Sequence, residues 1–149
     1  MYLIYLEKKS KLAGYGNKKK ARLTYQQVEK ILHGDIKWML QSEHLLVREL
    51  YAKMQTQQLR PKTVVDYIRE PFVFAPGNVR VTMDYSIRTS LNYNDFLSND
   101  CLTIPTEENL IILEVKWDEF LPDVIRLAIQ LDGRRVTAFS KYAQCRIYG

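Results

Sequence analysis

The stretch Leu110-Ile-Ile-Leu-Glu-Val-Lys-Trp117 decides the fold that this sequence predicts. Side chains alternate across a β-strand, so every second side chain from Ile111 to Trp117 is apolar and shares one face, while Glu114 and Lys116 share the other. A carboxylate and an ammonium group side by side in so apolar a strand are costly to bury unless something uses them. The stretch therefore predicts a strand whose polar face belongs to a site.

The segment Val79–Arg88 repeats this pattern. Its expected apolar face consists of Val79, Val81, Met83, Tyr85 and Ile87. Its expected polar face consists of Arg80, Thr82, Asp84, Ser86 and Arg88. Two strands of this kind suggest an antiparallel sheet curled around a polar, mostly basic interior. Such an interior would suit a polyanion together with a metal ion.

Capping and turn residues predict the other elements. Thr24 with Gln27 three residues later is the pattern of a capping box, and Gly34 is placed to end that helix. Residues 89–109 are rich in Asn, Asp, Ser and Thr and are expected to form a long loop. The remaining expected elements are a hairpin over 1–23 with a turn at 14–17, a short turn at 35–40, a helix over 43–59, a strand over 62–69, a connection over 70–77, a helix opened by Pro122 that ends near Gly133, and a tail over 134–149 that is ambiguous between strand and helix.

Length and charge narrow the class of protein. The 149 residues fit one domain over positions 1–149, and the net charge of +5 favours anionic partners. No apolar run approaches the about 18 residues of a membrane span, and the start of the chain does not have the form of a signal peptide. Cys101 and Cys145 form no Cys-x-x-Cys motif, and His33 and His44 supply no zinc-ligand spacing. We therefore expect a cytoplasmic protein with two free thiols.

The candidate site combines basic side chains with one carboxylate. Arginine offers a fixed fork of donors for phosphate oxygens, and lysine offers a compact positive charge. Magnesium and manganese are usually held by one or two carboxylates together with phosphate oxygens of the substrate. The candidate residues are Lys9, Lys20, Tyr67, Arg69, Arg80, Arg88, Glu114, Lys116, Ser140 and Lys141.

Simpler interpretations of the same residues stay open at this point. Glu114 and Lys116 would also suit the solvent side of a half-exposed strand. Arg80, Asp84 and Arg88 would also form a surface ladder of opposite charges. The run Lys18–Lys20 is more often a solvated hairpin than a site. The sequence contains no P-loop, Rossmann fingerprint or Ser/His/Asp set, and no aromatic pattern of the kind that stacks bases.

Four ordered motifs resemble the VTC (vacuolar transporter chaperone) polyphosphate-polymerase domain in its bacterial form. They are Asp66-Tyr-Ile-Arg-Glu-Pro-Phe72, Asn78-Val-Arg-Val-Thr-Met-Asp84, Ile112-Leu-Glu-Val-Lys-Trp-Asp-Glu-Phe-Leu-Pro122 and Phe139-Ser-Lys-Tyr142. The early Leu6-Glu-Lys-Lys9 hairpin and the helices over 35–59 also look like that family. The resemblance therefore covers essentially the whole chain.

This resemblance implies an α+β fold of the triphosphate-tunnel (CYTH-like) kind, an antiparallel barrel with helices outside and a basic lumen. It implies phosphoryl transfer from ATP to inorganic polyphosphate with Mn²⁺ or Mg²⁺. Glu114 resembles the metal-binding glutamate, and Tyr67 and Ser140 resemble hydrogen-bonding neighbours of the phosphates. The residues that resemble phosphate-holding lumen residues are Lys9, Lys20, Arg69, Arg80 and Lys141. Lys116 is added because it shares a face with Glu114, and Arg88 and Asp84 are added by alternation.

Family members begin with further strands that carry a lumen lysine and an Arg-x-Arg pattern, and this chain starts after them. We therefore expect the hairpin at Met1 to be a middle pair of the full barrel, completed by a preceding segment or a partner chain. Three activities stay open: polyphosphate synthesis from ATP, hydrolysis of tripolyphosphate or nucleoside triphosphate in the same tunnel, and polyphosphate binding without turnover. Nucleic acid is not the expected partner, although nonspecific binding driven by the net charge is a further alternative, and no membrane segment is expected in this chain.

Overall fold

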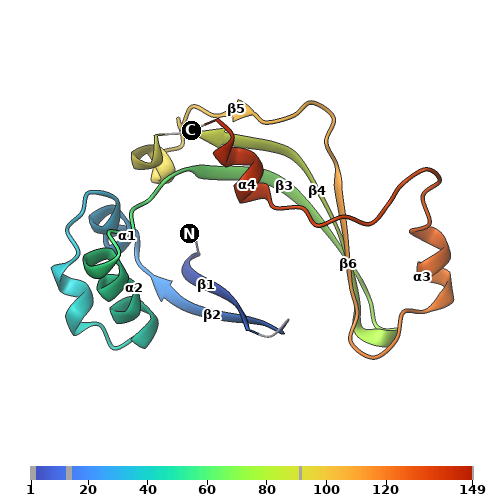
Figure 1. Ribbon diagram of the computed structural model, residues 1–149, viewed down its shortest axis with the longest axis horizontal. Coiled ribbons are helices and arrows are strands. Elements are labelled where there is room, and N and C mark those ends of the chain that lie inside the picture. Colours follow the sequence, from blue (N-terminus) through green and yellow to red (C-terminus); the bar gives the residue numbers. More distant parts are fainter. Residues whose placement is uncertain (1–2, 13–14, 91, 149) are drawn as a thin grey trace. The chain divides into compact units, whose positions relative to one another are not determined.

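The structure is a computed structural model that describes residues 3–12, 15–90 and 92–148. The chain divides into two compact units, one formed by Met1–Lys62 with Asn92–Cys101 and the other by Thr63–Leu91 with Leu102–Gly149. Both contain antiparallel strands and helices, so the predicted α+β class is confirmed (Figure 1). In the described residues no helix combines the length and the apolar character needed to span a membrane.

The first unit pairs a hairpin with helices. Its elements are β1 (Ile4–Leu12), β2 (Tyr15–Leu23), α1 (Tyr25–Leu32), the 3-10 helix η1 (Lys37–Gln41), α2 (Leu45–Thr56) and the 3-10 helix η3 (Tyr93–Leu97). The hairpin is confirmed, but Tyr15, Gly16 and Asn17 belong to β2 instead of the expected turn, and positions 13–14 lie outside the described residues. The expected helix over 43–59 is shorter, and the expected loop over 89–109 contains η3.

Helix α1 begins and ends where its capping residues predict. The Thr24 side chain accepts a hydrogen bond from the Gln27 amide at 3.2 Å, and the Gln27 side chain accepts one from the Thr24 amide at 2.9 Å. Beyond the helix, Gly34 adopts φ +80, a conformation that glycine reaches without strain. The predicted capping box is therefore confirmed.

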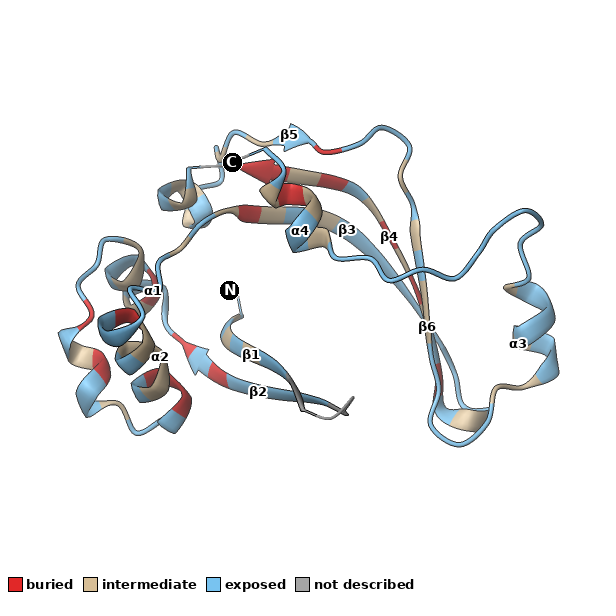
Figure 2. Cartoon of the chain, in the orientation of Figure 1, coloured by how far each residue is buried: buried red, intermediate tan, exposed pale blue. Residues whose placement is uncertain are grey.

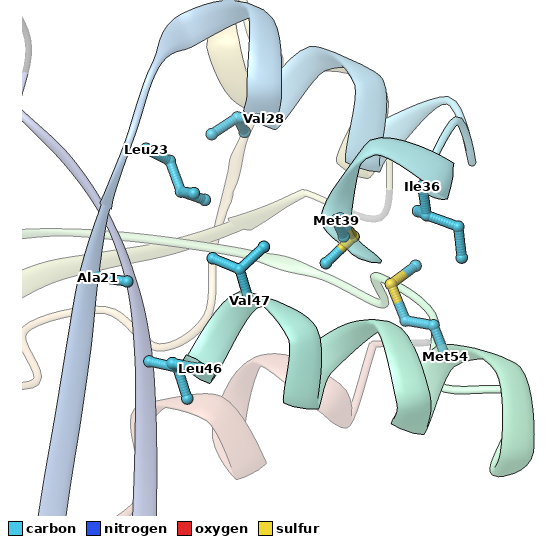
Figure 3. Packing of buried hydrophobic residues seen from close by; sticks show 8 residues of the cluster. All are labelled: Ala21, Leu23, Val28, Ile36, Met39, Leu46, Val47 and Met54. Atoms are coloured by element: carbon cyan, nitrogen blue, oxygen red, sulfur yellow. The ribbon is translucent and has the colours of Figure 1, made fainter. Parts of the chain in front are cut away.

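An apolar cluster holds the hairpin of the first unit to its helices (Figure 3). Met39 and Val47 have no exposed surface, and Ala21 and Leu23 supply the contribution of β2. The cluster consists of Ala21, Leu23, Val28, Ile36, Met39, Leu46, Val47 and Met54. Because Ala21 and Leu23 lie on one face of the hairpin, the opposite face is left for polar residues.

The second unit is built on a sheet with β4 at its centre. Its elements are β3 (Val64–Phe74), the 3-10 helix η2 (Pro76–Asn78), β4 (Val79–Ser90), β5 (Ile104–Pro105), β6 (Ile112–Lys116), α3 (Asp123–Ala128) and α4 (Lys141–Arg146). Strand β3 pairs along one edge of β4, and β5 and β6 pair along the other, all antiparallel. Burial alternates along much of β4 (Figure 2). The ambiguous tail is helical at α4, and α3 ends at Ala128, before the expected end near Gly133.

The expected connection over 70–77 is wrong for most of its length, because β3 continues to Phe74. Pro71 is accommodated because β3 is an edge strand, where a missing amide hydrogen need not break a ladder bond. The turn into β4 uses Gly77 at φ +74, and a Cβ atom there would collide with the carbonyl oxygen of Phe120. Glycine is therefore required at this turn for two separate reasons.

A β-bulge near Ser86 changes the predicted alternation of β4. The register passes from Ile68 opposite Tyr85 to Asp66 opposite Arg88, so one residue of β3 faces two of β4. Ser86 has φ +52, which fits such an irregularity. Since one extra residue reverses the side-chain alternation, Arg88 lies on the face opposite to Asp84. The expectation that Arg88 shares a face with Asp84 is therefore wrong.

The described strands form two separate sheets, β1–β2 and β3–β4 with β5 and β6, and neither closes on itself. A closed barrel is therefore not formed by the described residues within either unit. The antiparallel pairing and the flanking helices agree with the expected class, and the single-domain assignment over 1–149 stays a prediction.

Candidate functional site

Three rows of paired residues cross the sheet of the second unit on one face. Partners directly opposite each other in an antiparallel pair project to the same side. The rows are Arg69–Asp84–Ile112, Pro71–Thr82–Glu114 and Val73–Arg80–Lys116. Tyr67 joins this side because it lies two residues before Arg69 on β3. We define the polar face by Tyr67, Arg69, Arg80, Thr82, Asp84, Glu114 and Lys116.

Asp84 is the buried centre of an ion-pair cluster on the polar face. Its side chain is 1% exposed, and its two oxygens accept hydrogen bonds from Arg69 Nε at 2.6 Å and Arg69 Nη2 at 2.7 Å. Lys141 Nζ, from α4, donates a third bond at 2.6 Å. Three charge-assisted bonds meet the needs of a buried carboxylate. The alternative of a surface ladder of Arg80, Asp84 and Arg88 is therefore wrong for Asp84.

The hydrogen bonds between Asp84 and its cations shift the pKa values of Asp84 and Arg69. The hydrogen bond from Arg69 lowers the pKa of Asp84 to about 2, burial opposes this change, and the hydrogen bond from Lys141 adds to it. The hydrogen bond to Asp84 likewise raises the pKa of the Arg69 guanidinium, and the negative charge of Glu114 contributes a smaller increase. Glu114 and Arg69 belong to neighbouring rows of the polar face.

Tyr67 forms an aromatic platform for both cations of this cluster. Lys141 Nζ lies 4.8 Å from the centre of the Tyr67 ring, and the Arg69 guanidinium carbon lies 5.4 Å from it. Both distances are in the range of a cation–π contact. The Ser140 hydroxyl accepts a hydrogen bond from the Ala143 amide at 3.2 Å and so caps α4. Ser140 thus fixes the helix that presents Lys141 to Asp84.

Glu114 and Lys116 pair with each other on the polar face, with Lys116 Nζ 3.0 Å from Glu114 Oε1. Their side chains are 43% and 66% exposed, so the pair is accessible to a ligand. Opposite Lys116, the exposed Arg80 guanidinium makes no hydrogen bond or ion pair with any residue that the structure describes. The predicted strand that carries Glu114 and Lys116 on one side is confirmed.

Thr82 has a buried hydroxyl for which the described residues provide no partner. The residue is 4% exposed and lies directly opposite Glu114. Its Oγ1 atom makes no hydrogen bond within the described part of the chain. A buried hydroxyl normally finds a partner, so this exception needs an explanation. Sequence alternation places Thr82 on the polar face but gives no sign of the missing partner.

The other predicted phosphate-binding residues are not part of the polar face as defined above. Arg88 donates from Nε to Thr103 Oγ1 at 2.8 Å and from Nη2 to the Thr103 carbonyl, so it holds the segment next to β5. In the first unit, Lys9 and Lys20 project from the face of the hairpin opposite to its apolar cluster. Lys20 Nζ lies 5.0 Å from the centre of the Tyr5 ring.

The register of the hairpin shows which of the three consecutive lysines, Lys18–Lys20, lie on the same face as Lys9. Lys18 lies opposite Lys9 and pairs with Glu7 at 2.7 Å, which lowers the pKa of Glu7. Lys19 lies opposite Lys8, whose ammonium group pairs with Glu49 of α2. Lys19 therefore shares the helix-facing side, and Lys18 and Lys20 are the two that share a face with Lys9.

Among the residues of the polar face, Glu114 has the carboxylate that could contact a divalent cation. Within the described residues, no group of three His, Cys, Asp or Glu side chains gathers as a complete metal site. Asp84 uses both oxygens for Arg69 and Lys141, which leaves Glu114 as the accessible carboxylate of this face. Mg²⁺ and Mn²⁺ commonly bind through one carboxylate, water and substrate phosphate oxygens. Glu114 could hold such a cation, and directly opposite it lies the Thr82 hydroxyl, which has no partner in the described part of the chain.

Comparison with models of protein families places nearly the whole sequence in one family. A family model described as VTC domain matches residues 2–148. A search of curated proteins found no match, and neither did a search of solved structures. The family match covers every residue of the polar face as well as Lys9, Lys20, Ser140 and Lys141.

Proposed function

Because this chain belongs to the VTC domain family, we propose that its polar face binds the phosphate chains of ATP and inorganic polyphosphate and supports metal-dependent synthesis of polyphosphate. Family membership supports a role in polyphosphate chemistry. The observation that carries the specific proposal is the Arg80 guanidinium, which has no partner among the described residues and lies directly opposite Lys116, next to the row of Glu114. Phosphate oxygens are the natural partners of such a group.

The cations of the polar face suit an extended polyanion. Arg69, Arg80, Lys116 and Lys141 supply four positive charges, against the two negative charges of Asp84 and Glu114. Rows two residues apart along a strand are separated by about 6.5 Å, so the charges are spaced along the face instead of focused on one point. A chain of linked phosphates presents its own charges at repeated intervals in the same way.

In the proposed reaction, a terminal oxygen of polyphosphate forms a bond to the γ-phosphorus of ATP. The bond from that phosphorus to the bridging oxygen breaks, and ADP leaves. A cation at Glu114 would neutralise charge on the phosphate oxygens. Arg80 and Lys116 would align the phosphates, while Arg69 and Lys141 would stabilise the charge that develops during transfer.

Calorimetric titration of tripolyphosphate tests the binding step, with Mn²⁺ present, for wild type, Arg80→Ala and Arg126→Ala. A charge-assisted hydrogen bond contributes about 1.5–3 kcal/mol, so Arg80→Ala should weaken binding by about 10-fold to 100-fold. Arg126→Ala removes the same charge from α3, where Arg126 pairs with Asp123, and should leave affinity within about 2-fold. Equal losses in both variants would contradict a specific role for Arg80.

Incubation with ATP and Mn²⁺ then separates the possible activities by their products. Chains longer than the polyphosphate primer, formed together with ADP, are the expected result. Free phosphate without longer chains would instead assign hydrolysis to the same residues. Binding without any product would assign a polyphosphate-binding module. Absence of tripolyphosphate binding in the wild type would refute the proposal as a whole.

A further inference from the structure

Thr82 and Glu114 lie directly opposite each other on β4 and β6, but their side chains form no hydrogen bond with each other. Opposite residues in an antiparallel pair have Cβ atoms about 4.5–5.5 Å apart, so a hydroxyl and a carboxylate in these positions are within reach of each other. In the structure the Glu114 carboxylate instead contacts Lys116 Nζ at 3.0 Å. The Thr82 hydroxyl, on a residue 4% exposed, is left without a partner among the described residues.

Among the side chains of the polar face, Glu114 is the best available acceptor for the hydrogen of the Thr82 hydroxyl. The two oxygens of Asp84 already accept three bonds, from Arg69 and Lys141. Arg80 and Lys116 carry donors and no acceptor in their side chains. Glu114 is therefore the nearby side chain whose lone pairs are available to this hydrogen.

Glu114 is free to change its partner. Its side chain is 43% exposed, and that of Lys116 is 66% exposed, so water competes with their ion pair. A rotation of the Glu114 side chain would exchange one oxygen contact without moving the strand. Carboxylates that hold metal ions are typically fixed by a hydrogen bond to a neighbouring group, which orients the ligating oxygen.

We propose that Thr82 is a positioning residue for Glu114, and this inference rests on the proposed function. When a cation and a phosphate chain bind together, the Glu114 carboxylate turns from Lys116 to the Thr82 hydroxyl. The hydroxyl donates its hydrogen to one carboxylate oxygen, and the other oxygen faces the cation. The Lys116 ammonium group is thereby released to contact phosphate.

This exchange couples the metal to the phosphate chain. Without a cation, Glu114 neutralises Lys116 and that lysine contributes little to phosphate binding. With a cation, the carboxylate is occupied and Lys116 adds its positive charge to the face. The coupling predicts that Mn²⁺ strengthens tripolyphosphate binding and that Thr82 is needed for this gain.

The test is calorimetric titration of tripolyphosphate with and without Mn²⁺, for wild type, Thr82→Val and Thr82→Ser. Thr82→Val keeps the shape of the side chain and removes the hydroxyl. Loss of a hydrogen bond to a metal-holding group typically lowers metal affinity or activity by about 10-fold to 100-fold. We expect Thr82→Val to lose that much of the Mn²⁺-dependent gain while its metal-free affinity stays within about 2-fold of wild type. Thr82→Ser should retain the gain.

Thr89→Val is a matched control on the same strand. Thr89 is 1% exposed, but its hydroxyl lies 2.9 Å from Thr63 Oγ1 and donates to the Val64 carbonyl at 3.1 Å. Thr89→Val should therefore lower the melting temperature. Thr82→Val should leave it unchanged or raise it, because the Thr82 hydroxyl makes no hydrogen bond to the described residues. The signs of the two shifts separate a positioning role from a structural one.

Four other results would contradict the role of Thr82, and two of them would also contradict all or part of the proposed function. A full Mn²⁺-dependent gain in Thr82→Val, or equal weakening with and without Mn²⁺, would overturn the role of Thr82 and leave the proposed function intact. A wild type that binds tripolyphosphate without any gain from Mn²⁺ would overturn the role of Thr82 and the cation at Glu114, and would leave only the phosphate-binding part of the proposed function intact. A wild type that does not bind tripolyphosphate under either condition would overturn both proposals.

Discussion

Replacement of Asp84 by asparagine tests whether one buried carboxylate holds α4 to the sheet. In the structure the pKa of Asp84 is lowered from its ordinary 3.8 to about 2, chiefly by the hydrogen bond from Arg69. Each unit of pKa corresponds to about 1.4 kcal/mol, so this lowering represents about 2 kcal/mol of folding stability. The side chain is 1% exposed, so solvent screens this contribution little.

The sign of the pH dependence follows from the direction of the pKa change. Because the folded protein lowers the pKa, the stabilisation is fully present above about pH 4 and is lost as pH falls toward about 2. Asp84→Asn removes the titrating group and should abolish this part of the acid dependence. At pH 7 we expect a loss of about 2–3 kcal/mol. This is less than the about 3–5 kcal/mol that removal of one partner of a buried ion pair typically costs. The loss is smaller because Arg69 is 42% exposed, so water can hydrate its guanidinium once Asp84 is replaced.

The assay needs a probe in the second unit. The chain has two tryptophans, so in a Trp38→Phe background the fluorescence of Trp117 reports urea unfolding of that unit. Hydrogen exchange of the α4 amides is the second readout, because a helix of six residues is not stable without its tertiary contacts. Both measurements are made at pH 7, 4 and 2.5.

Asp123→Asn is the matched control, because Asp123 is an exposed carboxylate that pairs with Arg126 in the same unit. It should change stability by less than about 1 kcal/mol and leave α4 exchange unaltered. The reasoning is refuted if Asp84→Asn keeps the acid dependence of the wild type between pH 4 and 2.5. It is also refuted if α4 exchanges no faster in Asp84→Asn than in Asp123→Asn.

Two further predictions concern the turn at Gly77 and the reactivity of Cys145. In urea unfolding, Gly77→Ala should destabilise the second unit by about 1–3 kcal/mol more than Gly133→Ala. Both glycines have positive φ, but a Cβ atom would collide with the Phe120 carbonyl oxygen at Gly77 and would collide with no described residue at Gly133. Equal effects would show that the collision is relieved at little cost. Burial raises the pKa of the Cys145 thiol, whose residue has no exposed surface, so a thiol-specific reagent should modify Cys101 first in the native protein and both in urea. Simultaneous modification in the native protein would contradict this.

The sequence predicted the features of this chain that depend on local spacing. Alternation in β6 placed Glu114 and Lys116 on one face because a regular strand has a strict period of two. Thr24 and Gln27 located the start of α1 because a capping box involves residues three apart. These signals are contained within short segments, so no tertiary contact is needed to interpret them.

Features that depend on contacts between distant segments were missed. Arg88 was misplaced because the bulge at Ser86 inserts one residue into β4, and serine carries no strong signal for positive φ. Asp84 was assigned to a possible surface ladder because its second cation, Lys141, lies 57 positions away and arrives only when α4 packs on the sheet. The expected connection over 70–77 was wrong for most of its length because β3 continues through Pro71, which an edge strand tolerates.

The polar face divides into a fixed half and an exchangeable half, and this division follows from burial. Asp84 is buried and holds Arg69 by two bonds, so a phosphate chain is not expected to displace it. Of the five N–H donors of an arginine, Arg69 then keeps three for another acceptor. Glu114 and Lys116 are exposed, so their pair can open when charge arrives. The proposed function therefore requires different behaviour from the two carboxylates: Asp84 must stay bound to its cations to keep them in position, and Glu114 must release Lys116 to bind a metal ion.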